Sequence, residues 1–328
     1  MKKSSFVKTI TLLTFFSLTA LIYSETFRVS KVHEAKVLQE QGSEATARLN
    51  INDALAIKLP EDRDFIEGLE LKFEIPEAVA YWMDCVACSV YSNIKPTPSS
   101  SQIDYSGTRV YVSTLPGKLS WVLQIPLKKE NSLKSNNYTT KVDSVVEPSG
   151  NAILVRLQPV MKGVPEETLN SIIPITVKPI LSNKGLLELK ANDNGETPKA
   201  YSVFIDDKIA ALDNGKIILD NGIHNISIIS EFYRNEMRTV RIEIARTTLI
   251  QVDLKSIEPT LIIQAPEGSQ ILLDDAECKI IGQEFLITEG EHKINFKFGD
   301  YEILRTITAI KGKTYKASFS MDFDIEEE

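Results

Sequence analysis

The sequence predicts an all-β protein: an N-terminal β-sandwich of jelly-roll-like or immunoglobulin-like layout, followed by two small tandem β-modules. Apolar and polar residues alternate strictly at 69–75, 240–244 and 293–298, which is the period of a half-buried strand. Pro, Gly and Asn interrupt such runs at short intervals, a pattern that favours sandwiches or small barrels. A duplication in the C-terminal half completes the prediction, because a repeat fixes the architecture of the segment that holds it.

The duplicated segments match at an offset of 68 residues until one residue is lost. The pairs are 202–207 with 270–275, 221–226 with 289–294, Tyr233 with Tyr301, and, after the loss, 238–240 with 305–307. A residue that recurs in both copies is more simply explained as part of a shared fold than as one catalytic centre.

The second copy carries an ordered series of short motifs. Pro266, Glu267 and Gly268 precede a short apolar strand and an Asp-Asp turn, and the segments 290–292 and 299–301 follow. In this order the copy resembles the PEGA module, a small all-β domain of bacterial envelope and surface proteins, with Ser269 where the family has Ala. The first copy resembles it through the repeat, and together the copies cover about residues 184–322. The resemblance implies a non-catalytic, structural or binding role. The motif residues it marks are Asp206, Gly222, His224, Tyr233, Pro266, Glu267, Gly268, Asp274, Gly290, His292 and Tyr301.

The order of elements predicts four segments. A strand at 175–180 closes the N-terminal domain, Pro259 interrupts strand pairing between the copies, and Pro165 with two acids begins one short helix at 165–170. The segments are a signal peptide at 1–24, a β-sandwich domain at 25–183, the first PEGA-like repeat at 184–256, and the second repeat with an acidic tail at 257–328.

The N-terminus has the layout of a secretory signal, with Lys2, Lys3 and Lys8 before an apolar stretch at 10–22 and a cleavage point near 23–25. The apolar stretch is short for a bilayer span, although an uncleaved anchor is the alternative. We expect a periplasmic, secreted or cell-surface protein without a later transmembrane segment. The net charge of −8 disfavours nucleic-acid binding, which needs a basic surface, and the oligomeric state stays open.

The sequence offers no catalytic residue, no metal site and no cofactor motif. His224 and His292 are repeat equivalents, and His292 shares strand parity with Ile294, which predicts a buried, hydrogen-bonded imidazole. Asp206 and Asp274 begin Asp-Asp pairs after apolar strands, where Asp suits a hairpin turn. Calcium needs more converging oxygen ligands than such a pair supplies.

Cys85 and Cys88 have Cys-X-X-Cys spacing within a strand-like run. In an extended strand such residues point to opposite faces roughly 10 Å apart, which is too far for a disulfide. The pair therefore either lies in a bend and is bridged, or forms two small apolar side chains on a strand, with redox or metal chemistry as a third reading. Cys278 is the odd cysteine.

Aromatic residues of the N-terminal domain are the candidates for ligand binding. They are Tyr81, Trp82, Tyr91 and Trp121, which either stack on sugar rings or fill the sandwich core. Trp121 shares parity with Leu119 and Leu123, which predicts a core position, whereas Trp82 lies on a mixed face and is the better candidate for exposure.

These observations predict a secreted, non-enzymatic bacterial envelope protein whose repeats act as spacer and docking surface for protein or cell-wall partners. One alternative is a carbohydrate- or peptidoglycan-binding protein that acts through the aromatic N-terminal domain. Another is an accessory subunit of a periplasmic secretion or motility assembly. The partner expected is an envelope protein or a cell-wall glycan.

Overall fold

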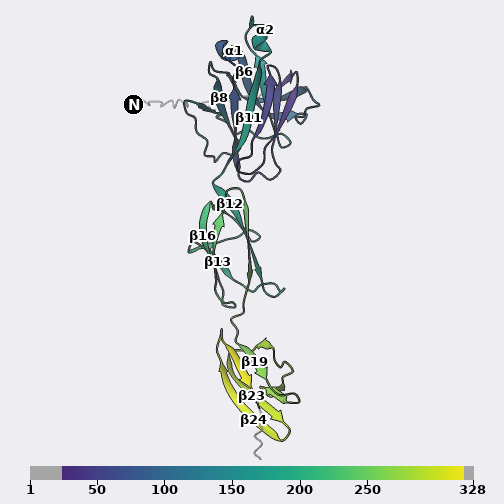
Figure 1. Cartoon of the computed structure of the whole chain (residues 1–328), viewed down its shortest axis with the longest axis vertical. Coiled ribbons are helices and arrows are strands. Elements are labelled where there is room, and N and C mark those ends of the chain that lie inside the picture. The colour runs from purple at the N-terminus through teal and green to yellow at the C-terminus, as the bar shows by residue number, and fades with distance from the viewer. Residues whose placement is uncertain (1–23, 321–328) are drawn as a thin grey trace, which may run out of the picture. The chain divides into compact units, whose positions relative to one another are not determined.

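A computed structural model describes residues 24–320 of the chain, and it confirms an all-β protein (Figure 1). The chain divides into two compact units, Met1–Ser182 and Asn183–Glu328. Two short helices interrupt the strands of unit 1, and α2 (Glu166–Leu169) falls within the segment predicted as helical. The predicted signal peptide lies outside the described residues except for Ser24, as does the end of the acidic tail.

Two mostly antiparallel sheets form unit 1. The six-stranded sheet has the order β1 (Ser24–Arg28), β7 (Asp104–Thr114), β6 (Val86–Lys95), β10 (Ala152–Pro159), β4 (Ala54–Lys58), β2 (Val32–Lys36). The five-stranded sheet has the order β3 (Ala45–Asn50), β11 (Ile172–Leu181), β5 (Ile66–Glu74), β8 (Ser120–Pro126), β9 (Thr139–Lys141).

One apolar core lies between these two sheets. Ile175, Phe73 and Trp121 are cross-strand neighbours on β11, β5 and β8, and all three are buried. Val90 on β6 and Val155 on β10 enter the same core from the other sheet. The strict alternation at 69–75 was interpreted as a half-buried strand, and this is confirmed, because every second side chain in this part of β5 faces the core.

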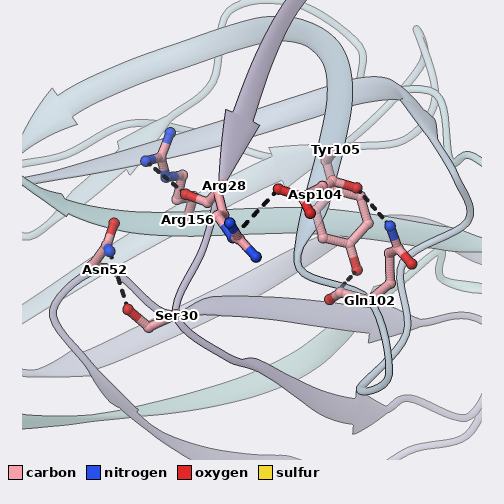
Figure 2. Close-up of polar contacts among 7 residues, drawn as sticks. All are labelled: Arg28, Ser30, Asn52, Gln102, Asp104, Tyr105 and Arg156. Atoms are coloured by element: carbon pink, nitrogen blue, oxygen red, sulfur yellow. Dashed lines mark hydrogen bonds and ion pairs between the residues drawn. The ribbon is translucent and has the colours of Figure 1, made fainter.

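A second, smaller apolar cluster covers the outer side of the six-stranded sheet, around Tyr105. Polar contacts fasten β1 there (Figure 2): Arg28 pairs with Asp104 at 3.5 Å, and Arg156 Nη2 donates to the Arg28 carbonyl at 3.2 Å. Tyr105 donates its hydroxyl to the Gln102 carbonyl at 3.0 Å. Because β6 is covered on both faces, its sequence is apolar or small at nearly every position instead of alternating.

The duplicated half folds as the same seven-stranded arrangement twice. In the first repeat the sheets have the orders β15-β12-β18 and β14-β13-β16-β17, and in the second β22-β19-β25 and β21-β20-β23-β24. The first-repeat strands are β12 (Lys184–Asn192), β13 (Ser202–Ile205), β14 (Lys208–Ala210), β15 (Lys216–Asp220), β16 (Gly222–Ile229), β17 (Glu236–Ile242) and β18 (Thr247–Asp253). Those of the second repeat are β19 (Thr260–Gln264), β20 (Gln270–Leu273), β21 (Ala276–Glu277), β22 (Glu284–Leu286), β23 (Gly290–Phe298), β24 (Tyr301–Ala309) and β25 (Thr314–Ser318).

Strand register is also repeated. His224 lies opposite Val240, and His292 lies opposite Ile307. Each repeat has its own apolar core, with Ile226 central to one and Ile294 to the other. In both repeats the first and last strands pair in parallel, so the chain enters each repeat at one end and leaves it at the opposite end.

Candidate functional site

Loops from distant parts of the sequence meet at one end of unit 1, which we call the tip. The strand register brings together the connections 75–85, 115–119 and 160–171 with the segment just before β9. Helix α1 (Glu77–Tyr81) and helix α2 lie there in contact (Figure 1). Strand β11 begins beside α2 and ends at Leu181, so the tip is the end of unit 1 farthest from where the chain leaves it.

Hydrogen bonds and side-chain contacts connect the tip loops to one another. The Ile75 amide donates to the Leu119 carbonyl at 2.9 Å, and the Val160 amide donates to the Cys85 carbonyl at 3.0 Å. Lys118 Nζ lies 6.0 Å from the centre of the Tyr138 ring. A Cβ on Gly117 would approach Met83 Cβ to 3.3 Å, so the 115–119 loop lies directly against the end of α1.

Exposed apolar side chains gather at this tip. Within residues 24–182, nine large apolar side chains are exposed, and six of them lie here. They are Tyr81, Met83, Leu119, Tyr138, Val160 and Met161. Tyr81 is 82% exposed and Tyr138 is 80% exposed. Exposed apolar side chains gathered at one end of a domain are typical of an interaction surface, whereas single exposed apolar residues need no explanation.

The structure separates the four aromatic residues proposed for ligand binding. Tyr81 is exposed at the tip, and Trp82 beside it is half-buried against the core. Trp121 is buried, packs on Phe73 with ring centres 4.9 Å apart, and donates its indole N–H to Thr140 Oγ1 at 3.0 Å. Tyr91 is also buried and bonds to Glu25 at 2.6 Å. Tyr91 and Trp121 are therefore removed from the ligand-binding set, since neither ring face is accessible.

The structure shows no disulfide between Cys85 and Cys88. Both are buried and unpaired, and both pack into the core between the sheets. Burial raises the pKa of both thiols, which disfavours the reactive thiolate. Cys85 lies in the bend just before β6 and Cys88 lies on that strand, so the pair combines the bend of the first reading with the unbridged, buried side chains of the second. Cys278 is likewise free and partly exposed.

A His–Asp contact recurs in both repeats. His224 Nδ1 lies 2.7 Å from Asp206 Oδ2, and His292 Nδ1 lies 2.6 Å from Asp274 Oδ2. The other ring nitrogen faces a backbone carbonyl, at 2.9 Å for His224 and 2.7 Å for His292. Both acceptors lack a hydrogen, so each ring nitrogen must donate and the imidazolium is the form that satisfies both contacts.

Electrostatics agree with that geometry. The bond to Asp274 is the main cause that raises the pKa of His292. For His224, burial alone would lower the pKa, but the Asp220 carbonyl and the Asp206 carboxylate together raise it. The pKa of Asp274 is lowered chiefly by His292, and that of Asp206 chiefly by the Asn225 amide. The predicted hydrogen-bonded imidazole is present in both copies, although only His292 is fully buried.

The Asp-Asp pairs form tight turns, as their position after apolar strands predicts. Asp206 and Asp207 have φ of +48° and +64°, and Asp274 and Asp275 have +52° and +67°. Two central residues with positive φ define the turn that best joins twisted antiparallel strands.

The glycines before each His and the Gly268 loop also have positive φ. Gly222 has φ of +153° and Gly290 of +130°, each two residues before its His. These backbone angles favour glycine, which explains why both copies have Gly at this position. Gly268 has φ of +87° in the turn that follows Pro266 and Glu267, between β19 and β20.

The two matched tyrosines have different environments. Tyr233 is buried, donates to Asp193 Oδ2 at 2.5 Å and accepts from the Lys199 amide at 2.8 Å. Tyr301 is 70% exposed and begins β24. The connection from β16 to β17 is longer than the two-residue turn from β23 to β24. Tyr233 therefore lies in a loop that packs on the core of its repeat, whereas Tyr301 is part of strand β24. Their match in sequence is not a match in role.

Within residues 24–320 no group of three or more His, Cys, Asp or Glu side chains is placed to hold a metal ion. No helix in that range is long and apolar enough to cross a membrane. The tip residues Met83 and Tyr138 were missed by sequence reasoning, because their proximity depends on separate connections that no local pattern marks. Leu119 was placed with Trp121 on an apolar face, but it is exposed because β8 begins only at Ser120.

Comparisons with known proteins give weak likenesses. No family model matches the chain, and no curated protein matches it. Among solved structures, the Bacillus anthracis TIE protein is 10% identical, with a TM-score of 0.27 over 90% of this chain and 57% of its own length. A streptococcal ancillary pilin is 9% identical over 81% of this chain and 98% of its own, with a TM-score of 0.23. The pilus adhesin SpaC from Lactobacillus rhamnosus GG is 7% identical over 90% and 42%, with a TM-score of 0.23. The chain thus spans little more than half of the TIE protein, and likenesses of this strength carry no argument about function.

Proposed function

We propose that this is a non-enzymatic protein of the bacterial envelope in which two PEGA-like repeats are spacers and the tip of unit 1 is a docking surface. The observation that carries the spacer role is the parallel pairing of first and last strands in both repeats. Such a repeat takes the chain in at one end and releases it at the other, so each copy adds length.

Docking is supported by the clustering of six exposed apolar side chains at the end of unit 1 opposite to Leu181. Interface cores are enriched in Tyr and Met, and four of these six side chains are Tyr or Met. The spacers then hold the tip away from whatever anchors the rest of the chain.

A variant of the full chain tests the docking role. Met83→Glu and Leu119→Glu place charges on the tip without touching a buried residue. Mild crosslinking in native cells should capture one defined partner with the unchanged protein and lose it with this variant. The matched control is Leu38→Glu, an exposed apolar residue outside the tip. Equal capture by all three proteins would refute tip docking.

Glycan binding is the second candidate, favoured by Tyr81 and Tyr138, whose rings are the most exposed of the apolar residues at the tip. Aromatic faces of this kind stack on sugar rings. Peptidoglycan pull-down and glycan arrays with Tyr81→Ala and Tyr138→Ala separate the two candidates. If the tip binds glycans, the unchanged protein binds them and the two variants lose that binding. If the tip docks a protein, the unchanged protein binds no glycan.

A further inference from the structure

The four-stranded sheet of the first repeat has an apolar side turned away from the core. Alternate residues of β16, Ile226 and Ile228, are buried, so their neighbours on the strand point outward. Ile209, Phe204, Ser227 and Met237 follow one another across β14, β13, β16 and β17 on this outward side. With Ile223 and Ile229 they form what we call the repeat 1 outer face.

These side chains are far more exposed than a folding role would require. Ile209 is 74% exposed, and Ile223 and Met237 are each 70% exposed. Their burial therefore contributes little to the stability of the repeat, because stabilisation scales with the apolar area removed from water.

The second repeat has charged side chains at three of the equivalent positions of its own outer face. In the same register, Glu277 replaces Ile209, Glu291 replaces Ile223 and Lys297 replaces Ile229. The fold therefore accepts charge at all three positions, and the apolar residues of the first repeat need an explanation other than folding.

Charge on the face has one sign. Arg241 is its single charged side chain, lies opposite Ile223 and is exposed. Among residues 24–320 no carboxylate lies within ion-pair distance of it. The face thus has apolar side chains around the Ser227 hydroxyl and the Asn225–Thr239 pair, which is hydrogen-bonded at 2.8 Å, and one available cation at its edge.

The dimensions of the face limit its occupant. The four strands have 22 residues in total, and at about 3.4 Å per residue and about 4.8 Å between strands they give a face of roughly 350 Å². A stable dimer buries about 800 Å² per partner, so a second copy is disfavoured. A single helix, about 10 Å across, fits the width, and a helix layer is a usual cover for an apolar sheet face.

We propose that the repeat 1 outer face binds an amphipathic helix of a partner protein, with apolar residues over Ile209, Phe204 and Met237 and a carboxylate beside Arg241. This goes beyond the spacer role proposed for the repeats, and it is independent of the tip. The helix would cross the four strands obliquely, from Ile209 on β14 toward Arg241 on β17, and the equivalent face of the second repeat would not bind it.

Defined peptides test the proposal on the full chain. One has about 18 residues, five helical turns, with a Leu stripe flanked by Glu; a second has Lys in place of Glu. NMR titration should shift amides of β13, β16 and β17 with the Glu peptide. Ile209→Glu, Ile223→Glu and Ile229→Lys together should weaken its binding on the order of tenfold or more, because these are the residues that the second repeat has.

Three further measurements complete the test. The reciprocal variant, Glu277→Ile with Glu291→Ile and Lys297→Ile, should create a second site in repeat 2, and Arg241→Glu should lower affinity for the Glu peptide alone. Met83→Glu at the tip should leave peptide binding unchanged, which separates this proposal from tip docking. Equal binding of both peptides, unchanged binding by the triple variant, or self-association that the triple variant abolishes would each overturn it.

Discussion

At the scale of single residues, the His–Asp contacts are the clearest departure from a purely apolar module. Each links the first hairpin turn of a repeat to the strand β16 or β23. The Asp accepts from both the ring and a backbone amide, at 2.9 Å from Asn225 and 2.8 Å from Lys293. In each repeat the Asp carboxylate therefore connects the hairpin turn that holds it to the His ring and to the backbone of the neighbouring strand.

We expect His292→Gln to lower the stability of the second repeat by about 1.5–3 kcal/mol near pH 6, the usual loss for a hydrogen bond to a charged group. The raised His292 pKa means that the imidazolium contribution is complete below about pH 6.5 and is lost as the pH rises through the folded-state pKa. The lowered Asp274 pKa adds a contribution that is present above about pH 4 and lost as the pH falls through its folded-state value.

Chemical denaturation at several pH values checks this, with the exposed neighbour Glu291→Gln as the control. The difference in the free energy of unfolding between His292→Gln and the unchanged protein should become smaller toward alkaline pH. If that difference in unfolding free energy did not depend on pH, His292 would stabilise the repeat by packing alone.

The two tryptophans give a second prediction. Trp121→Ala should destabilise unit 1 by about 3–5 kcal/mol, as expected for truncating a buried aromatic side chain, whereas half-buried Trp82→Ala should cost distinctly less. Thermal unfolding of both variants measures the difference. Equal melting temperatures for Trp121→Ala and the unchanged protein would contradict the core position of Trp121.

At the scale of elements, alternation predicted most strands because each has one face against a core. The helix α1 was not predicted, since its five residues hold no periodic pattern and only Val79 is buried. Nor could the tip be predicted, because the exposure of Tyr81 or Tyr138 depends on loops that the register of other strands brings together. The Cys pair was left open for a similar reason, since only the course of β6 decides whether it bends.

The hairpin turns support a prediction at this scale. Asp275 has φ of +67°, which costs an L-residue more than it costs glycine. Asp275→Gly should stabilise the second repeat by about 0.5–1 kcal/mol, and Asp275→Val should destabilise it. Denaturation midpoints of the two variants, compared with Asp300→Gly in the neighbouring turn, test the sign. Asp274→Gly should instead be unfavourable, because it removes the partner of His292.

At the scale of the whole molecule, separate cores predict separable stability. Ile226→Ala and Ile294→Ala are equivalent truncations in the two repeats and should each cost about 2–5 kcal/mol. Amide hydrogen exchange should speed up in the core strands of the altered repeat and stay unchanged in unit 1. Faster exchange throughout the chain would show that its cores unfold together.

The parallel first and last strands of each repeat also decide how the protein responds to mechanical force. A pull on the two ends of a repeat acts along both strands in opposite directions, so all the hydrogen bonds between them are loaded in shear at once instead of opening one after another. Seven residue pairs join β12 to β18, and five join β19 to β25. The second repeat is therefore the one expected to yield first under tension, which would make it an extensible link beside a stiffer one.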